Sequence, residues 1–144
     1  MNLFGMLELS GSALGAERQR AEVVASNMAN VQTTRTPQGG PYRRQMVVFQ
    51  SQRAPHFSLA LAGLHPGTAS AVRVAAVVSD QRPPVMRFEP GHPDANAEGY
   101  VAYPQVDPVE EMTDLLGAVR AYELNASAVQ ATKNMITQSL DLMR

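Results

Sequence analysis

The sequence predicts an α+β protein in which two long terminal helices flank a small β-rich middle segment. Apolar residues recur at helical spacing near both ends, whereas the middle is rich in proline and glycine and contains short β-type runs. We therefore expect an N-terminal helical segment (1–34), a middle β-rich segment with loops (35–106) and a C-terminal helical segment (107–144). At 144 residues, the chain has room for one ordinary domain or for a small domain with extended arms.

The first helix is expected between Leu3 and Val31. Its apolar residues follow the alternating three-and-four step of a heptad repeat, which only Ser10 and Glu17 interrupt. A polar string, Asn30–Thr36, and the proline and glycines that follow it end the helix. The apolar stripe consists of Leu3, Leu7, Leu14, Ala21, Val24, Met28 and Val31.

The middle segment is predicted to form short strands separated by turns. In the second of these runs, the alternate residues from Val72 to Val78 are apolar and are expected on one face of a half-buried strand. The last two runs flank the turn-rich Pro90–Glu98, which could link them as a hairpin, and residues 51–70 show no useful periodicity. The expected strands are Tyr42–Phe49, Val72–Val78, Val85–Glu89 and Tyr100–Tyr103.

The C-terminal helix has the clearest pattern. Asp107 is a suitable N-cap, Pro108 suits the first helical position, and Glu110 completes a start that resembles a capping box. One helix is predicted from Pro108 almost to Arg144, about 55 Å long at the helical rise per residue. Since this exceeds the diameter of a compact domain of this size, about 30 Å, the helix needs a partner outside its own domain. Its apolar stripe, with Lys133 as the single polar member, consists of Met112, Leu115, Val119, Tyr122, Ala126, Val129, Ile136, Leu140 and Met143.

The composition excludes several classes of function. A formal net charge of -1 argues against nucleic acid or an anionic membrane as a partner, because both leave a basic footprint. The absence of cysteine excludes disulfides, thiol catalysis and the common zinc motifs. The N-terminus has no basic region before its apolar residues and is a poor Sec signal peptide. No apolar run approaches the roughly 20 residues that a membrane span needs, so we expect a soluble chain.

Catalytic, cofactor and metal sites are not predicted. The sequence has no Gly-x-Ser-x-Gly elbow, phosphate loop or His-Glu-x-x-His motif, so we do not expect an enzyme or a small-molecule substrate. His92, Asp94 and Glu98 lie close together in sequence. The prolines and glycines around them favour a turn whose polar groups bond its own backbone over a metal site.

Several stretches carry a resemblance to a known family. Val23–Thr34 resembles the N-terminal motif of bacterial flagellar rod, hook and related axial proteins, in which a helix ends in an Asn-apolar-small-Asn step. Asp107–Met112 and Arg120–Glu123 are similar to the C-terminal helix of that family. Among the flagellar basal-body rod proteins, the resemblance is strongest to the proximal rod proteins. It is carried by the two middle stretches Thr34–Arg44 and Pro90–Val101.

The resemblance implies a structural subunit of the flagellar basal-body rod, the shaft that transmits torque from motor to hook. It implies that the terminal helices form a coiled-coil-like layer, with the middle segment outside it. The implied partners are copies of the same chain, other proximal and distal rod proteins, the protein at the junction of MS ring and rod, and the flagellar type III export apparatus in transit. It also implies a rod crossing the periplasm and export without a cleaved signal peptide.

The expected functional site is an assembly interface made of both apolar stripes. The resemblance adds Asn27 and Asn30, which it places where the first helix turns out of the layer, although an asparagine there can also be only a cap. A compact α+β domain is the alternative fold, and a soluble adaptor or an export-chaperone-like module is the alternative function. The predicted interface consists of Leu7, Leu14, Val24, Asn27, Met28, Asn30, Met112, Leu115, Val119, Tyr122, Val129, Ile136 and Leu140.

Overall fold

A computed structural model describes residues 3–53 and 70–142 of the chain. Two long helices at the ends and antiparallel strands between them make the protein α+β, as predicted. Most of the segment 51–70, and Met143 of the predicted C-terminal stripe, lie outside the described residues. The elements are α1 (Leu3–Ala29), β1 (Gln45–Arg53), β2 (Ser70–Ser79), β3 (Val85–Phe88), β4 (Tyr100–Tyr103) and α3 (Pro108–Asp141).

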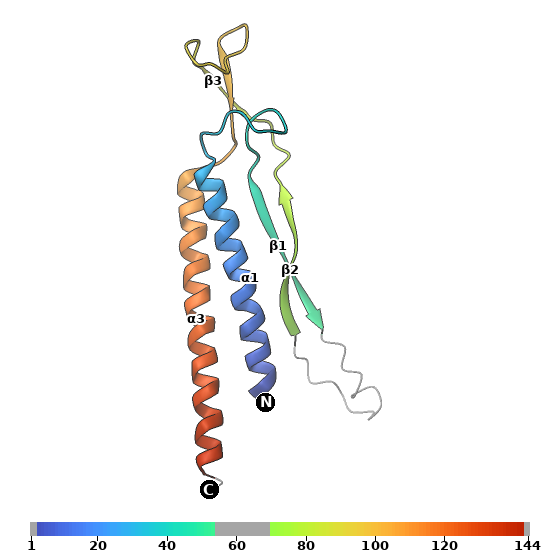
Figure 1. Ribbon diagram of the computed structural model, residues 1–144, viewed down its shortest axis with the longest axis vertical. Helices are drawn as coiled ribbons and strands as arrows, with labels where there is room; N and C mark the ends of the chain where they lie inside the picture. The colour runs from blue at the N-terminus through green and yellow to red at the C-terminus, as the bar shows by residue number, and fades with distance from the viewer. Residues whose placement is uncertain (1–2, 54–69, 143–144) are drawn as a thin grey trace.

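The molecule is elongated, and α1 and α3 lie side by side in opposite directions (Figure 1). With 34 residues, α3 is about 51 Å long and extends past the first turn of α1, which has 27 residues. The β1–β2 hairpin packs along the other side of α1, and the β3–β4 hairpin lies at the end of the molecule remote from the end of α3. The helix α1 is therefore the central element, covered by α3 on one side and by the hairpin on another.

The start of α3 follows from its sequence, with one exception. The Asp107 side chain accepts a hydrogen bond from the Val109 amide at 2.9 Å, and Pro108 begins the helix as predicted. Glu110 does not complete a capping box among the described residues, because its carboxylate lies 3.3 Å from Arg44 Nη2 instead. A charged partner binds a carboxylate more strongly than a backbone amide does, so the ion pair is favoured.

The β1–β2 pairing contains an irregularity that the sequence pattern does not reveal. Val48 lies opposite Ala76, whereas the next residue, Phe49, lies opposite Val74. Ala75 is thus an extra residue in β2 and forms a β-bulge. Because side chains alternate along a strand, one inserted residue moves the residues beyond it to the opposite face.

The prediction that the alternate apolar residues of β2 share one face is therefore wrong. Val72 and Val74 are half-buried on the side of α1, where the Val72 amide donates to Ser12 Oγ at 3.0 Å. Ala76 and Val78 lie beyond the bulge and are exposed. The outer face of the hairpin therefore keeps apolar residues in contact with solvent.

The β3–β4 hairpin has the predicted strands and the predicted connecting loop. The pairs run from Val85 opposite Tyr103 to Phe88 opposite Tyr100. Gly99 closes the loop with φ +84, and a Cβ at this position would lie 2.9 Å from Phe88 Cε2. Only glycine combines this backbone conformation with so close a neighbour.

The core of the described residues is small. Its buried apolar members are Ala16, Val24, Val101 and Ala118. Larger apolar side chains, including most of those on α3, stay partly in solvent. In the part of the chain that the structure describes, neither long helix has the continuous apolar stretch needed to cross a membrane.

Candidate assembly interface

The surface between α1 and α3 is built from small and polar side chains. On α3 the buried residues are Glu111, Ala118 and Thr132, which are spaced by multiples of seven residues. From α1, Val24 and Asn27 are buried in the same region of the molecule. The two helices of one chain therefore approach closely. They meet along a stripe of α3 that differs from the apolar stripe predicted from the sequence.

The predicted apolar stripe of α3 lies at the edge of this contact or in solvent. Met112 and Leu140 are each 57% exposed, and Val119 and Tyr122 are each 43% exposed. Leu115, Val129 and Ile136 are half-buried. The predicted residues of α1 are more enclosed: Val24 and Asn27 are buried, whereas Leu7, Leu14, Met28 and Asn30 are half-buried.

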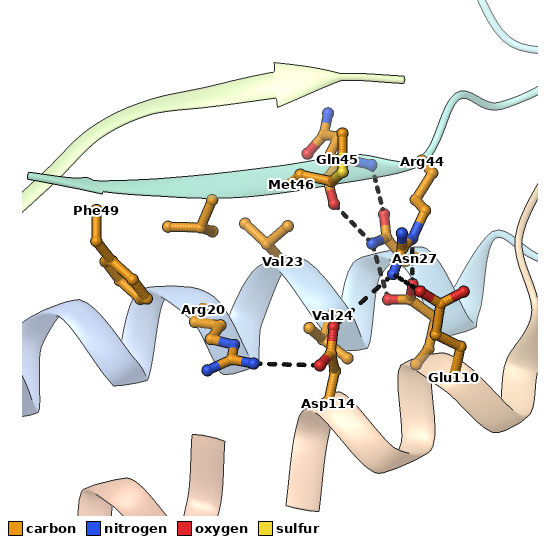
Figure 2. Close-up of a pocket in the computed structure, with 12 residues that line it drawn as sticks. Arg20, Val23, Val24, Asn27, Arg44, Gln45, Met46, Phe49, Glu110 and Asp114 are labelled. Carbon is orange, nitrogen blue, oxygen red and sulfur yellow. Dashed lines mark hydrogen bonds and ion pairs between the residues drawn. The ribbon is translucent and has the colours of Figure 1, made fainter. Parts of the chain in front are cut away.

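At the end of α1, Asn27 joins the helix to the first strand (Figure 2). Its Oδ1 accepts a hydrogen bond from the Gln45 amide at 2.9 Å, and its Nδ2 donates to the Gln45 carbonyl at 2.8 Å. The side chain thus hydrogen-bonds to both the amide and the carbonyl of Gln45, in the way that the backbone of a neighbouring strand would. The same Oδ1 also accepts from the Tyr42 hydroxyl at 2.9 Å. With 1% of its surface exposed, Asn27 is a buried polar residue whose groups are all hydrogen-bonded.

The fully buried Glu111 connects this group to α3. One carboxylate oxygen accepts from Asn27 Nδ2 at 2.9 Å, and the other accepts from Arg44 Nε at 2.5 Å. Arg44 also pairs with Glu110 at 3.3 Å and lies 3.8 Å from Asp114. We call Asn27, Tyr42, Arg44, Gln45 and Glu111 the polar junction, since it ties α1, β1 and α3 together at one end of the helix pair.

The electrostatics of the polar junction favour the charged form of its arginine. Burial acts to lower the pKa of Arg44, but the hydrogen bond and charge of Glu111, with the charges of Glu110 and Asp114, outweigh it. The pKa of Arg44 is raised above its ordinary value. The guanidinium therefore stays protonated and serves as a permanent link between the segment before β1 and the first turn of α3.

Asn30 has a more local role than Asn27. Its Nδ2 donates to the Ser26 carbonyl at 2.9 Å, and its Oδ1 accepts from the Thr33 hydroxyl at 3.1 Å. These bonds satisfy the last turn of α1 and the turn that follows it. The two asparagines that the sequence singles out therefore differ, since only Asn27 reaches another element.

A pocket of about 410 Å³ adjoins the polar junction between α1, β1 and the start of α3 (Figure 2). Val23, Val24 and Phe49 contribute apolar surface to it. Arg20 and Asp114 lie at its edge and form an ion pair with a distance of 3.1 Å. The charged groups around the pocket are engaged with one another, an arrangement suited to holding elements in place.

The segment around His92 forms a turn with internal hydrogen bonds. The Asp94 amide donates to His92 Nδ1 at 3.1 Å, and Asp94 Oδ2 accepts from the Thr34 hydroxyl at 2.8 Å. The Glu98 amide is held by the Asn96 side chain at 3.0 Å. Among the described residues, no group of three or more histidine and carboxylate side chains is arranged to hold a metal ion.

Sequence reasoning missed Glu111 and Arg44 as interface residues. A glutamate in the first turn of a helix is expected to stay in solvent near the helix dipole, and Arg44 follows a proline-rich turn. One signal was present: Glu111, Ala118 and Thr132 keep a seven-residue register of their own. Small and polar residues at seven-residue spacing occur both where two helices pack closely and on a helix face that is exposed to solvent. Only their burial in the folded chain distinguishes these two cases.

Comparison with known proteins gives matches at both ends and along the whole chain. Residues 7–35 match the family described as "Flagella basal body rod protein", and residues 97–142 match "Flagellar basal body rod FlgEFG protein C-terminal". The flagellar basal-body rod protein FlgC of Bacillus subtilis (strain 168) is 43% identical over 149 residues, which cover 99% of this chain and 99% of that protein. FlgC of Borreliella burgdorferi is 37% identical over 151 residues, covering 100% and 99%. FlgC of Escherichia coli O6:H1 is 40% identical over 143 residues, covering 99% and 98%.

Proposed function

Because the chain belongs to the family of flagellar basal-body rod proteins, we propose that its α1–α3 pairs pack against one another to form a layer of the proximal rod. The chain is a structural subunit of the bacterial flagellar basal-body rod and assembles there with other rod components.

The observation that carries the proposal is the apolar surface that α3 leaves uncovered. Val109 is 74% exposed and Leu124 is 72% exposed, and further apolar residues lie between and beyond them. Large apolar side chains exposed in such number along one helix indicate an interaction site. Because α1 covers only one side of α3, the remaining sides are available to helices of neighbouring subunits. The large exposed apolar residues of α3 are Val109, Met112, Leu116, Val119, Tyr122, Leu124, Met135 and Leu140, and Leu142 follows directly after the helix.

The polar junction suits a subunit that transmits torque. Arg44 and Glu111 connect the start of β1 to α3, and Asn27 connects the same strand to α1. A rotation of the helical layer is therefore passed to the middle segment through buried, fully bonded groups rather than through a flexible linker. In this arrangement the middle segment lies outside the layer and contacts neighbouring subunits.

The partners that we propose are copies of this chain, other proximal and distal rod proteins, and the protein joining the MS ring to the rod. The flagellar type III export apparatus carries the chain in transit, unfolded and without cleavage of a signal peptide. A core of a few small apolar side chains is compatible with this route, since it leaves little structure to undo before export. We assign the chain no catalytic role.

Fractionation of flagellated cells tests the proposal. A rod subunit is expected in detergent-resistant basal bodies, at a constant ratio to the other rod proteins in each preparation. The alternative, a soluble adaptor or export-chaperone-like module, uses the same helices transiently and is expected in the soluble fraction. Finding the chain only in the soluble fraction of cells with intact basal bodies would refute the rod assignment.

A further inference from the structure

A second groove lies on the α1–α3 surface, away from the polar junction. It has a volume of about 350 Å³, and its lining includes two small side chains, Ala21 and Ala118, of which Ala118 is only 1% exposed. Small residues flanked by larger ones form the kind of hole that accepts a side chain from another helix. The groove is lined by Glu17, Arg18, Ala21, Ala118, Val119 and Tyr122.

Glu17 gives this groove an incompletely satisfied negative charge. Its Oε2 is out of contact with solvent and has no hydrogen-bond donor among the described residues. Arg20 Nη1 is 3.6 Å away, whereas Arg20 Nη2 donates to Asp114 at 3.1 Å. Arg18, at the edge of the groove, is paired with Glu22 at 2.9 Å. The Glu17 carboxylate therefore has one long ion pair, with a guanidinium that it shares with Asp114, and can accept a further donor.

The opposite side of α3 carries a ridge that matches this groove. Leu116, Arg120 and Leu124 are spaced by four residues and therefore lie on one face of the helix. The leucines are 54% and 72% exposed, and Arg120 between them is exposed without an ion-pair partner in the described part of the chain. At about 100° per residue, this face is roughly opposite to Ala118. The groove is lined by the carboxylate of Glu17 and by Arg18, whose charge is balanced by Glu22, so an apolar ridge with one central cation is complementary to it.

The axial positions of groove and ridge also agree. Asn27 contacts Glu111, and the two helices run in opposite directions. Glu17 is ten residues before Asn27, so the residue of α3 at its level is ten residues after Glu111, which is Ala121, next to Arg120. A neighbouring copy in the same orientation therefore brings its Arg120 to the level of Glu17 with almost no shift along the helix axis.

Building on the proposed function, we propose that this groove receives the Leu116–Leu124 ridge of a second copy of the chain, with Arg120 of that copy bound to Glu17. Rotation about the terminal side-chain torsion of Glu17, which has a broad energy profile, turns a carboxylate oxygen toward the incoming guanidinium. The contact joins two different surfaces, so each copy offers a free groove to the next. Such head-to-tail contacts produce a ring or one turn of a helix, in which the copies lie side by side.

Charge exchange in the full-length chain tests this contact in cells. Glu17→Arg places two cations together and Arg120→Glu places two carboxylates together, so each single variant is expected to lower the yield of basal bodies by about tenfold or more. The double variant E17R/R120E restores the opposite charges and is expected to recover most of the wild-type yield. Because Arg120 is exposed, R120E should leave the urea unfolding midpoint of the purified chain unchanged. Single variants with wild-type yield, or a double variant no better than E17R alone, would refute the contact.

Cross-linking identifies the partner independently. The chain has no cysteine, so Ala21→Cys and Leu116→Cys introduce the only thiols, on opposite sides of the helix pair at one axial level. Oxidation of purified basal bodies should give covalent multimers of this chain, whereas Ala21→Cys with Glu98→Cys should give none. A product containing a different protein, or no product from basal bodies that contain the chain, would overturn the proposal while leaving the proposed function intact. Absence of the wild-type chain from basal bodies would overturn both.

Discussion

Asn27 and Gln45 are joined by two hydrogen bonds of 2.9 and 2.8 Å, in which one side-chain amide binds both backbone groups of the other residue. The end of α1 thereby fixes the first residue of β1. The arrangement requires a side chain with one acceptor and one donor on the same planar group, which among residues of this size only asparagine provides.

Replacing Asn27 by aspartate should destabilise the chain strongly. The variant keeps the acceptor for the Gln45 amide but loses the donor to the Gln45 carbonyl, and it places a second carboxylate beside Glu111. Since the site is buried, we expect a loss of about 3–5 kcal/mol in the free energy of unfolding. Urea unfolding followed by circular dichroism measures this loss.

Asn96→Asp is the matched control for this substitution. Asn96 is exposed, and within residues 3–53 and 70–142 its side chain bonds only through Oδ1, which accepts from the amides of Glu98 and Tyr100. Aspartate keeps that acceptor, so the free energy of unfolding should change by less than about 0.5 kcal/mol. Equal losses for the two variants would contradict the role assigned to the Asn27 donor.

Comparing Glu111→Gln with Glu110→Gln measures how much a buried and an exposed ion pair of the same arginine contribute to stability. The Glu111 side chain is fully buried and that of Glu110 is 58% exposed, and both pair with Arg44. Removing the buried charge should cost about 3 kcal/mol, because Arg44 stays largely enclosed. Removing the exposed one should cost under about 1 kcal/mol. Similar unfolding midpoints for the two variants would show that Glu111 does not hold the polar junction.

Gly99→Ala should destabilise the β3–β4 hairpin. The substitution places a Cβ 2.9 Å from Phe88 Cε2 at a residue with φ +84, so both the backbone and the packing oppose it. We expect a loss of about 1–3 kcal/mol, measured as urea unfolding of the purified chain. Gly91→Ala, in the same loop, meets no atom within 4 Å and has no positive φ. It should be close to neutral, and an equal effect of both would refute this explanation.

The sequence was sufficient for the elements of the fold but not for how they meet. Helical spacing and the Asp107–Pro108 cap predicted α3 to within a few residues, because these signals are local. The bulge at Ala75 and the Arg44–Glu111 pair depend on contacts between distant segments, and no local pattern in the sequence encodes them. The predicted role of the apolar stripe of α3 in assembly stays a prediction. The structure shows that α1 packs along a neighbouring, smaller and more polar stripe instead.

Val119→Asp tests the predicted apolar stripe in cells. Val119 is 43% exposed in the single chain, so the chain itself should tolerate the charge. In a packed layer the new carboxylate would lie in the groove with Glu17, where Arg120 of the neighbouring copy can balance only one of the two charges, at a cost of several kcal/mol in every subunit. We therefore expect secreted subunit, no rod beyond this layer and no swimming, because export handles unfolded chain. Gln130→Asp, at an exposed position of the same helix, should be much milder. Normal swimming of Val119→Asp cells would show that α3 is not part of the interface.

The most direct test of the rod account is a cryo-electron microscopy reconstruction of purified basal bodies at side-chain resolution. We expect α1 and α3 of this chain to form an antiparallel pair within a helical layer of the proximal rod. Arg44 and Glu111 should be bonded as in the isolated chain, Val119 should face a neighbouring helix, and residues 35–106 should lie outside the layer. A rod that lacks this chain, or one in which the exposed apolar residues of α3 face solvent, would contradict it.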